Sequence, residues 1–137
     1  MSDEASSPAV DEASSPEVVV VDDDPDLVDL VVDVLADVGV TALGCTNASE
    51  AFWFIGRTHP KLIILDVQMP GVDGIQLFRQ LREDPSLAET DVLFLTANPD
   101  LVSQALPDYT GRGATLIGKP FQVQELVDQI TKVLARP

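Results

Sequence analysis

The chain has 137 residues, 45% of them hydrophobic and 23% charged, which suits one globular domain with a single core. Its eight basic and 23 acidic residues give a formal net charge of −15, which argues against nucleic acid as a direct partner because phosphate backbones require clustered Lys and Arg. No apolar run approaches the roughly 20 residues of a membrane span. A single cysteine, Cys45, excludes an internal disulfide, so we expect a cytoplasmic protein that makes no membrane contact.

The first segment, residues 1–17, differs in composition from the rest. The sequence DEASSP occurs there twice, at 3–8 and at 11–16, without aromatic residues or a periodic apolar face. Such a segment buries too little surface to offset the entropy lost on ordering, so we expect a disordered acidic, Ser-rich tail. The remaining residues, 18–137, are expected to form one domain.

From residue 18 onward, strand-like and helix-like segments alternate. Strands are predicted where β-branched and aliphatic residues form short runs: 18–21, 40–45, 62–65, 92–95 and 115–117. A helix is predicted after each strand. The first begins at Pro25 and is ended by Gly39, the second runs from Asn47 to about Arg57, and the third runs from Gly74 to Arg82. The fourth is a poor helix interrupted by Pro99 and Pro107, and the last follows Pro120. Five alternating units predict an α/β fold with a parallel sheet and helices on both faces.

Charged side chains stand where three of these strands end. Asp22, Asp23 and Asp24 follow the first strand, Asp66 follows the third, and Lys119 follows the fifth. Ligands of open α/β sheets bind at the carboxyl ends of strands. Clustered carboxylates repel one another unless a cation joins them, and all-oxygen ligands favour a hard divalent ion such as Mg²⁺.

The same pattern indicates phosphoryl chemistry. A fixed carboxylate such as that of Asp66 can act as a nucleophile and form an aspartyl phosphate. Mg²⁺ and the ammonium of Lys119 would neutralise the phosphoryl oxygens, and the hydroxyl of Thr96, at the end of the fourth strand, would donate a hydrogen bond.

Four motifs in order, VVVVDDDPDL, LDVQMPGVDG, FLTA and GKPF, resemble the receiver domain of two-component response regulators over residues 18–137. The resemblance implies a flavodoxin-like (βα)5 three-layer sandwich with strand order 2-1-3-4-5. It also implies particular site residues: Asp66 as phosphoacceptor, Asp23 as direct and Asp22 as largely water-mediated Mg²⁺ ligand, the Gln68 backbone carbonyl as a further ligand, Thr96 and Lys119 as phosphoryl contacts, and a cis Lys119–Pro120 peptide. Asp24 lies outside the acidic pair and is read as a helix N-cap.

Two features depart from the family pattern. Leu116 occupies the position, three residues before the lysine, where receivers usually carry Tyr or Phe. The fourth helix, on the usual signalling face, is interrupted by proline. Both changes affect output rather than chemistry, so we expect altered coupling to partners.

Several other residues have a structural interpretation. Cys45 reads as a small core residue and His59 as a surface turn residue. Trp53 and Phe54 are expected to pack within the fold, although their adjacency allows one to point outward. Met69-Pro70-Gly71 and Asp73-Gly74 are read as turns. Gln68 and Asn98, each two residues past a key group, are candidates for controlling access of hydrolytic water.

The expected function is that of a stand-alone, single-domain response regulator. It would accept a phosphoryl group on Asp66 from a histidine kinase or phosphotransfer protein, hydrolyse it slowly, and signal to a downstream protein as a monomer or weak homodimer. One alternative is a receiver-like interaction module whose output does not depend on phosphate. Another is a phosphatase of the haloacid-dehalogenase type, which is disfavoured because Gln68 stands where that class has a second Asp.

Overall fold

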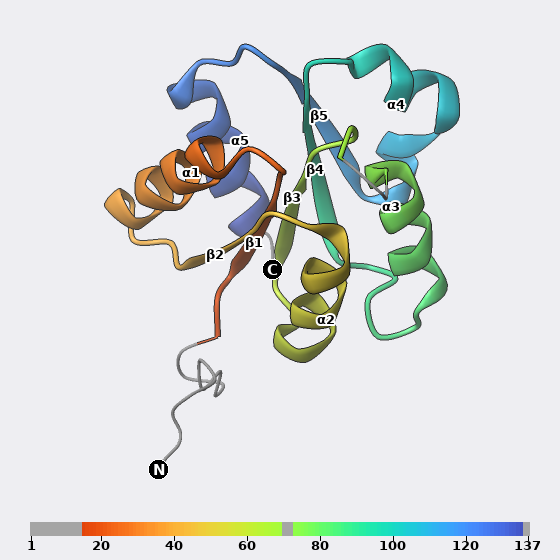
Figure 1. Ribbon diagram of the computed structural model, residues 1–137, viewed down its shortest axis with the longest axis horizontal. Helices are drawn as coiled ribbons and strands as arrows, with labels where there is room; N and C mark the ends of the chain where they lie inside the picture. The colour runs from red at the N-terminus through yellow and green to blue at the C-terminus, as the bar shows by residue number, and fades with distance from the viewer. Residues whose placement is uncertain (1–14, 70–72, 136–137) are drawn as a thin grey trace.

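The structure is a computed structural model that describes residues 15–69 and 73–135 (Figure 1). Strands and helices alternate along the described chain, as the sequence predicts. The strands are β1 (Val18–Val21), β2 (Ala42–Cys45), β3 (Leu62–Leu65), β4 (Asp91–Thr96) and β5 (Ala114–Gly118). The helices are α1 (Pro25–Asp37), α2 (Ala48–Thr58), α3 (Gly74–Glu83), α4 (Pro99–Ala105) and α5 (Val123–Leu134), with a 3-10 helix, η1 (Tyr109–Arg112), before β5.

The strands form one parallel sheet in the order β2-β1-β3-β4-β5. In β1, which lies between β2 and β3, each of the four valines is at most 1% exposed. A strand covered on both faces requires such a continuous apolar run, and each buried valine stabilises the fold by about 1.5–3 kcal/mol. The predicted flavodoxin-like order 2-1-3-4-5 is therefore confirmed.

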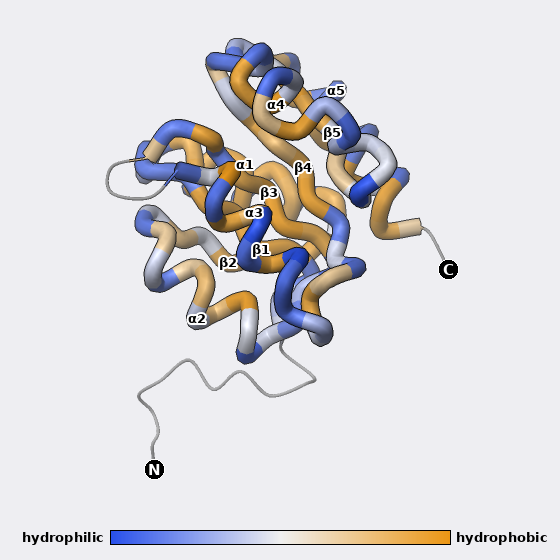
Figure 2. Tube along the Cα trace, turned by 90° about the vertical axis from the view of Figure 1, so that its right-hand side faces the viewer, coloured by the Kyte–Doolittle hydropathy of each residue, from blue (hydrophilic) through white to orange (hydrophobic). Residues whose placement is uncertain are grey.

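The sheet is the middle of three layers (Figure 1). Helices α1 and α5 cover one face, and α2, α3 and α4 cover the other. Successive strand residues point to opposite faces, so Val18 and Val20 pack with α1 and α5 while Val19 and Val21 pack with α2 and α3. Figure 2 shows the strands as the most hydrophobic part of the chain, enclosed by helices with more polar outer surfaces.

Side-chain caps begin three helices: Asp24 and Asn47 stand at predicted helix starts, and Asp73 lies in a segment that the sequence predicted only as a turn. Asp24 Oδ1 accepts hydrogen bonds from the backbone N–H groups of Asp26 (3.0 Å) and Leu27 (3.4 Å), which confirms Asp24 as an N-cap. Asn47 Oδ1 accepts from Glu50 N at 2.8 Å, and Asp73 Oδ1 accepts from Gln76 N at 2.8 Å. Each cap satisfies an N–H group that has no partner within the helix.

Some element boundaries differ from the prediction. The second strand begins at Ala42 and not at Val40, because the Val40 N–H donates to the Leu35 carbonyl (2.9 Å) and so closes the end of α1. The fourth strand includes Asp91 and Thr96, and the fifth extends over Ala114–Gly118. Pairing with a neighbouring strand adds these terminal residues, and such pairing is not visible in the local sequence.

The aromatic residues of α2 divide between core and solvent. Phe54 packs against the core, whereas Trp53 is 52% exposed, so one of the two adjacent aromatic residues points outward, as the sequence allowed. Ala48, Ala51 and Ile55 already fill the face of α2 that meets the sheet. Cys45 is 1% exposed, which confirms it as a core residue.

The fourth helix is short, as its prolines predict. It spans seven residues, and its N-cap residue, Asn98, makes no side-chain capping hydrogen bond. Proline is compatible with the first turn of a helix but not with its interior, so Pro99 begins α4 and Pro107 lies beyond its end.

Most of the predicted tail, residues 1–14, lies outside the described residues. Its last residue, Glu17, is joined to both neighbours of β1: the Glu17 N–H donates to the Thr41 carbonyl (2.9 Å), and the Glu17 carbonyl accepts from Lys61 N (2.8 Å). Within residues 15–69 and 73–135, none of the helices has the length and apolar character needed to cross a membrane.

Candidate functional site

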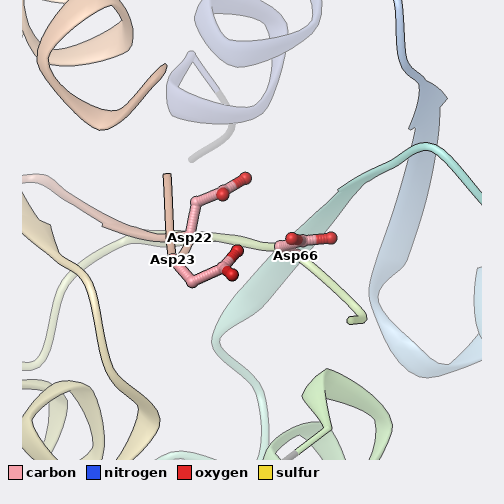
Figure 3. A group of neighbouring side chains, drawn as sticks. All are labelled: Asp22, Asp23 and Asp66. Atoms are coloured by element: carbon pink, nitrogen blue, oxygen red, sulfur yellow. The ribbon is translucent and has the colours of Figure 1, made fainter. Parts of the chain in front are cut away.

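Parallel pairing brings the acidic strand ends together. Val21 of β1 lies in register with Leu65 of β3, so the residues that follow, Asp22 and Asp66, leave the sheet side by side. Backbone hydrogen bonds hold both positions: Asp66 N donates to the Val21 carbonyl (2.9 Å) and Asp22 N to the Cys45 carbonyl (3.1 Å). Figure 3 shows the side chains of Asp22, Asp23 and Asp66 gathered at these ends of β1 and β3.

Three carboxylates form a compact acid cluster, which consists of Asp22, Asp23 and Asp66. One oxygen from each lies within 4.8 Å of the others. Asp22 is 3% and Asp66 is 6% exposed, whereas Asp23 is open to solvent. Asp24 is not part of this cluster, because its carboxylate caps α1 while its N–H donates to Asp22 Oδ1 at 3.0 Å.

Lys119 brings a positive charge to the acid cluster. Its Nζ lies 2.6 Å from Asp22 Oδ2 and 3.7 Å from Asp66 Oδ2. The backbone of Lys119 is held by a hydrogen bond from its N–H to the Thr96 carbonyl (2.7 Å), and the Lys119–Pro120 peptide is cis, as expected. The sequence predicted Lys119 as a contact to the phosphoryl group; in the structure its shortest contact is with Asp22, whose buried carboxylate otherwise lacks a cation among the described residues.

The electrostatic environment raises the pKa of Asp66. Burial is the largest cause, and the neighbouring carboxylate of Asp22 acts in the same direction. The ammonium of Lys119 and the backbone N–H groups of Gln68 and Val67 oppose this rise without cancelling it. The site therefore favours any further positive charge placed near Asp66.

The donor set fits a divalent cation. Three carboxylates and one ammonium carry a formal charge of −2, which a divalent ion balances. Carboxylate oxygens are ligands for hard ions such as Mg²⁺, which also retains several waters and so needs few protein ligands. The exposure of Asp23 leaves a solvent path to the cluster.

Thr96 lies at the same edge but is fully buried, with 0% of its surface exposed. Its hydroxyl accepts a hydrogen bond from the Asn98 N–H (3.0 Å), and within the described chain no hydrogen bond joins it to Asp66. Thr96 is paired with Gly118 and so lies next to Lys119. The structure thus brings Thr96 to the strand-end edge through β4 and β5.

Gln68 and Asn98 meet across the edge. Asn98 Nδ2 donates to Gln68 Oε1 at 3.2 Å, and Gln68 N donates to Asp66 Oδ1 at 3.3 Å. The sequence marked both residues by their spacing but gave no sign that they contact each other, because 30 residues separate them. This contact also explains why Asn98 does not cap α4: its side-chain amide is turned toward Gln68.

Gly74, which the sequence predicted only as the turn residue that begins a helix, also shapes the site. Its N–H donates to the Val67 carbonyl (2.8 Å), and a Cβ at this position would collide with the carbonyl oxygen of Asp66. The first turn of α3 therefore packs directly on the Asp66 backbone, and only glycine permits this approach. The other turn residues named above, Pro70 and Gly71, lie outside the described residues.

Leu116 is partly buried and packs against the core on the α2–α3–α4 side of the sheet. Its strand, β5, pairs with β4 through Phe94, which is fully buried. The departure from an aromatic residue is thus accommodated as ordinary packing.

The sequence profile of the response regulator receiver domain matches residues 18–131. The chain is 33% identical over 119 residues to the DNA-binding response regulator MtrA of Mycolicibacterium smegmatis, covering 87% of this chain and 50% of the relative. It is 34% identical to the response regulator Rre1 of Synechocystis, covering 86% of this chain and 51% of the relative. The chain thus spans about half the length of these two relatives.

Solved structures with the same fold include the receiver domain of Francisella response regulator 1452, with a TM-score of 0.75 and 25% identity over 86% of this chain and 95% of that one. Chemotaxis protein CheY4 of Vibrio cholerae is similar, with a TM-score of 0.74 and 26% identity over 85% of this chain and 96% of that one. The fold, the acid cluster and the profile match agree, and the chain belongs to the response regulator receiver domain family.

Proposed function

We propose that Asp66 accepts a phosphoryl group in a Mg²⁺-dependent reaction. The observation that carries this proposal is the acid cluster of Asp22, Asp23 and Asp66 around a single lysine, at the strand ends of a receiver fold. Asp22, Asp23, Asp66 and the backbone carbonyl of Gln68 would hold the ion, Asp22 largely through water. When bound, Mg²⁺ offsets the negative charge of the carboxylates and of the phosphoryl oxygens.

In the proposed reaction, an oxygen of the Asp66 carboxylate attacks the phosphorus of a phosphohistidine. The new P–O bond forms as the P–N bond breaks, and the histidine nitrogen retains the electron pair and takes a proton. Lys119, 3.7 Å from Asp66, would stabilise the charge on the phosphoryl oxygens. The Thr96 hydroxyl, which accepts from the Asn98 N–H, would donate its own proton to the same group, because a hydroxyl is both donor and acceptor.

The partners proposed are a histidine kinase or phosphotransfer protein as donor and a downstream protein as target. The net charge of −15 opposes direct contact of this chain with nucleic acid, although the names of several relatives describe DNA-binding proteins. A reducing cytoplasm is the proposed location, since the buried Cys45 is a free thiol.

Acetyl phosphate provides a direct test. The protein is incubated with Mg²⁺ and acetyl phosphate and then weighed intact, and wild type is expected to gain the mass of one phosphoryl group that hydroxylamine removes. Asp66→Asn should gain none. Asp24→Asn is the matched control: it makes the same change in a neighbouring acid that caps α1, and asparagine is an equally good cap.

Either of two results would contradict the proposal. If Asp66→Asn were phosphorylated, the phosphoryl group would be on another residue. If wild type reacted with neither acetyl phosphate nor a phosphorylated kinase, the chain would not be a phosphoryl acceptor.

A second candidate function is an interaction module whose output is independent of phosphate. Leu116 at the usual aromatic position and the seven-residue α4 favour it, because both lie where receivers couple phosphorylation to partners. Partner binding that is equal for wild type, phosphorylated wild type and Asp66→Asn would support this candidate over the first.

A further inference from the structure

Helix α2 carries more aromatic surface than the core uses. Phe52 is 38% exposed and Trp53 is 52% exposed, although the chain contains only five Phe, one Trp and one Tyr. By contrast, Phe78 and Phe94 are fully buried between α3 and the sheet. Adjacent exposed aromatic residues are typical of protein-contact surfaces, because they bury a large area at low entropic cost.

The indole of Trp53 is held in place before any partner arrives. The Arg57 guanidinium lies 4.5 Å from the centre of the Trp53 ring, one helical turn away. The Phe54 ring also contacts the indole, edge-on at 4.9 Å, and is itself packed on the core. A side chain ordered in advance loses little conformational entropy on binding, which favours affinity.

Beside these aromatic residues a groove of about 680 Å³ runs between α2 and α3. Phe52 and Ala48 line it from α2, and Leu77, only 1% exposed, lies on the α3 side. Figure 2 shows α2 and α3 next to each other on the face turned toward the viewer. We call this cleft, together with Trp53, the α2–α3 surface.

The charges that line the groove all have one sign. Glu83 and Asp84, at the end of α3, are its only charged lining residues within the described chain. They lie beside the apolar stretch formed by Ala48, Phe52 and Leu77. A complementary segment therefore presents an aliphatic side chain to the groove and a lysine or arginine to these carboxylates.

We propose that the α2–α3 surface docks a basic, amphipathic segment of a partner protein. A second copy of this chain is a poor occupant, because each copy has a net charge of −15 and would meet carboxylates with carboxylates. The chain's own N-terminal segment is poor for the same reason, since its DEASSP repeats carry acids and no base. A basic partner segment would instead be attracted to the carboxylates of Glu83 and Asp84.

This docking does not depend on phosphorylation. None of the residues that line the groove belongs to the acid cluster or is Lys119. The inference thus goes beyond the acceptor function proposed for Asp66, and Asp66→Asn is expected to bind the partner segment as wild type does.

A random 12-residue peptide display library tests the proposal. The library is selected on the full chain and counter-selected on Phe52→Asp. Enriched peptides are expected to carry Leu, Ile or Met next to Lys or Arg. Their synthetic versions are then titrated while the emission of Trp53, the one tryptophan in the sequence, is followed.

Variants decide whether the peptide occupies this surface. Phe52→Ala and Glu83→Lys should each weaken binding by about tenfold, and Glu83→Lys perturbs no buried group. Leu30→Ser is the matched control, because it removes an equally exposed apolar side chain from α1 on the opposite layer. Binding to Asp66→Asn should equal that to wild type.

Three outcomes would overturn the proposal. The first is a selection that enriches no peptide, or enriches acidic ones. The second is a peptide whose affinity is unchanged in both Phe52→Ala and Glu83→Lys. The third is sedimentation showing that the chain self-associates and that Phe52→Asp abolishes the association, which would make the occupant a second copy.

Discussion

The acid cluster and the α4–β5 region lie at the same edge of the sheet, yet they are held together very differently. At the acid cluster, Lys119 lies 2.6 Å from Asp22, and Gly74 packs against the carbonyl of Asp66. Backbone hydrogen bonds also hold Asp22 and Asp66 in place. At α4, the helix has seven residues and no side-chain cap, and Leu116 packs as an ordinary core residue. Charges in a buried site tolerate few arrangements, whereas an apolar contact can be replaced by another of similar volume. The acid edge of this chain is therefore more tightly constrained than its α4–β5 region.

The largest effect is expected from removing the lysine. Lys119→Gln leaves the carboxylate of Asp22, 3% exposed, without its cation, and should lower the free energy of unfolding by about 3 kcal/mol. Urea denaturation in EDTA measures this change. Lys132→Gln, an exposed site in the last turn of α5, should change it by less than about 0.5 kcal/mol. Equal effects of the two substitutions would show that Lys119 is not needed as the cation of Asp22.

A pair of glycines tests how closely α3 packs on Asp66. Gly74→Ala forces a Cβ against the Asp66 carbonyl and should lower the free energy of unfolding by about 2 kcal/mol and slow phosphorylation by acetyl phosphate. Gly56→Ala, in the last turn of α2 with no atom near the new Cβ, should instead raise stability by about 0.5–1 kcal/mol. If Gly74→Ala left the free energy of unfolding unchanged, the first turn of α3 would be able to move away from Asp66 at little cost.

The raised pKa of Asp66 predicts that Asp66→Asn stabilises the protein without Mg²⁺. A carboxyl whose pKa is higher in the folded state binds its proton more tightly there, so its ionisation opposes folding as pH rises through that pKa. The gain in melting temperature from Asp66→Asn should thus be present at pH 7 and should disappear in acid, where Asp66 is protonated. Adding Mg²⁺ should stabilise wild type more than Asp66→Asn. A variant less stable than wild type at pH 7 would contradict this electrostatic account.

The smallest effect on chemistry is expected at Leu116. Leu116→Tyr should leave the rate of phosphorylation within about twofold of wild type, because this residue is outside the acid cluster.

Beryllofluoride with Mg²⁺ should shift the NMR signal of the backbone amide of Asn98, which donates to the Thr96 hydroxyl. Absence of any NMR shift in residues 97–118 would show that the acid edge does not communicate with α4 and β5.

Local sequence signals predicted much of the fold. The four valines of β1, the helix starts at Asp24 and Asn47, and the strand-end acids were readable because each depends on neighbours along the chain. The exposure of Trp53 was not readable, since it follows from how completely Ala48, Ala51 and Ile55 fill the core face of α2. Likewise, the contact between Gln68 and Asn98 joins loops that only strand pairing brings together.

The sequence by itself determined the alternation of strands and helices, the motifs of a receiver domain and the residue types at its site, because periodicity, capping and spacing are properties of the linear chain. Only the tertiary structure decided that Lys119 pairs most closely with Asp22, that Gly74 must be small to let α3 reach the Asp66 backbone, and that α2 and α3 leave an acidic groove beside exposed aromatic residues. These properties depend on distances between segments far apart in the chain, which packing of the sheet and its two helical layers sets.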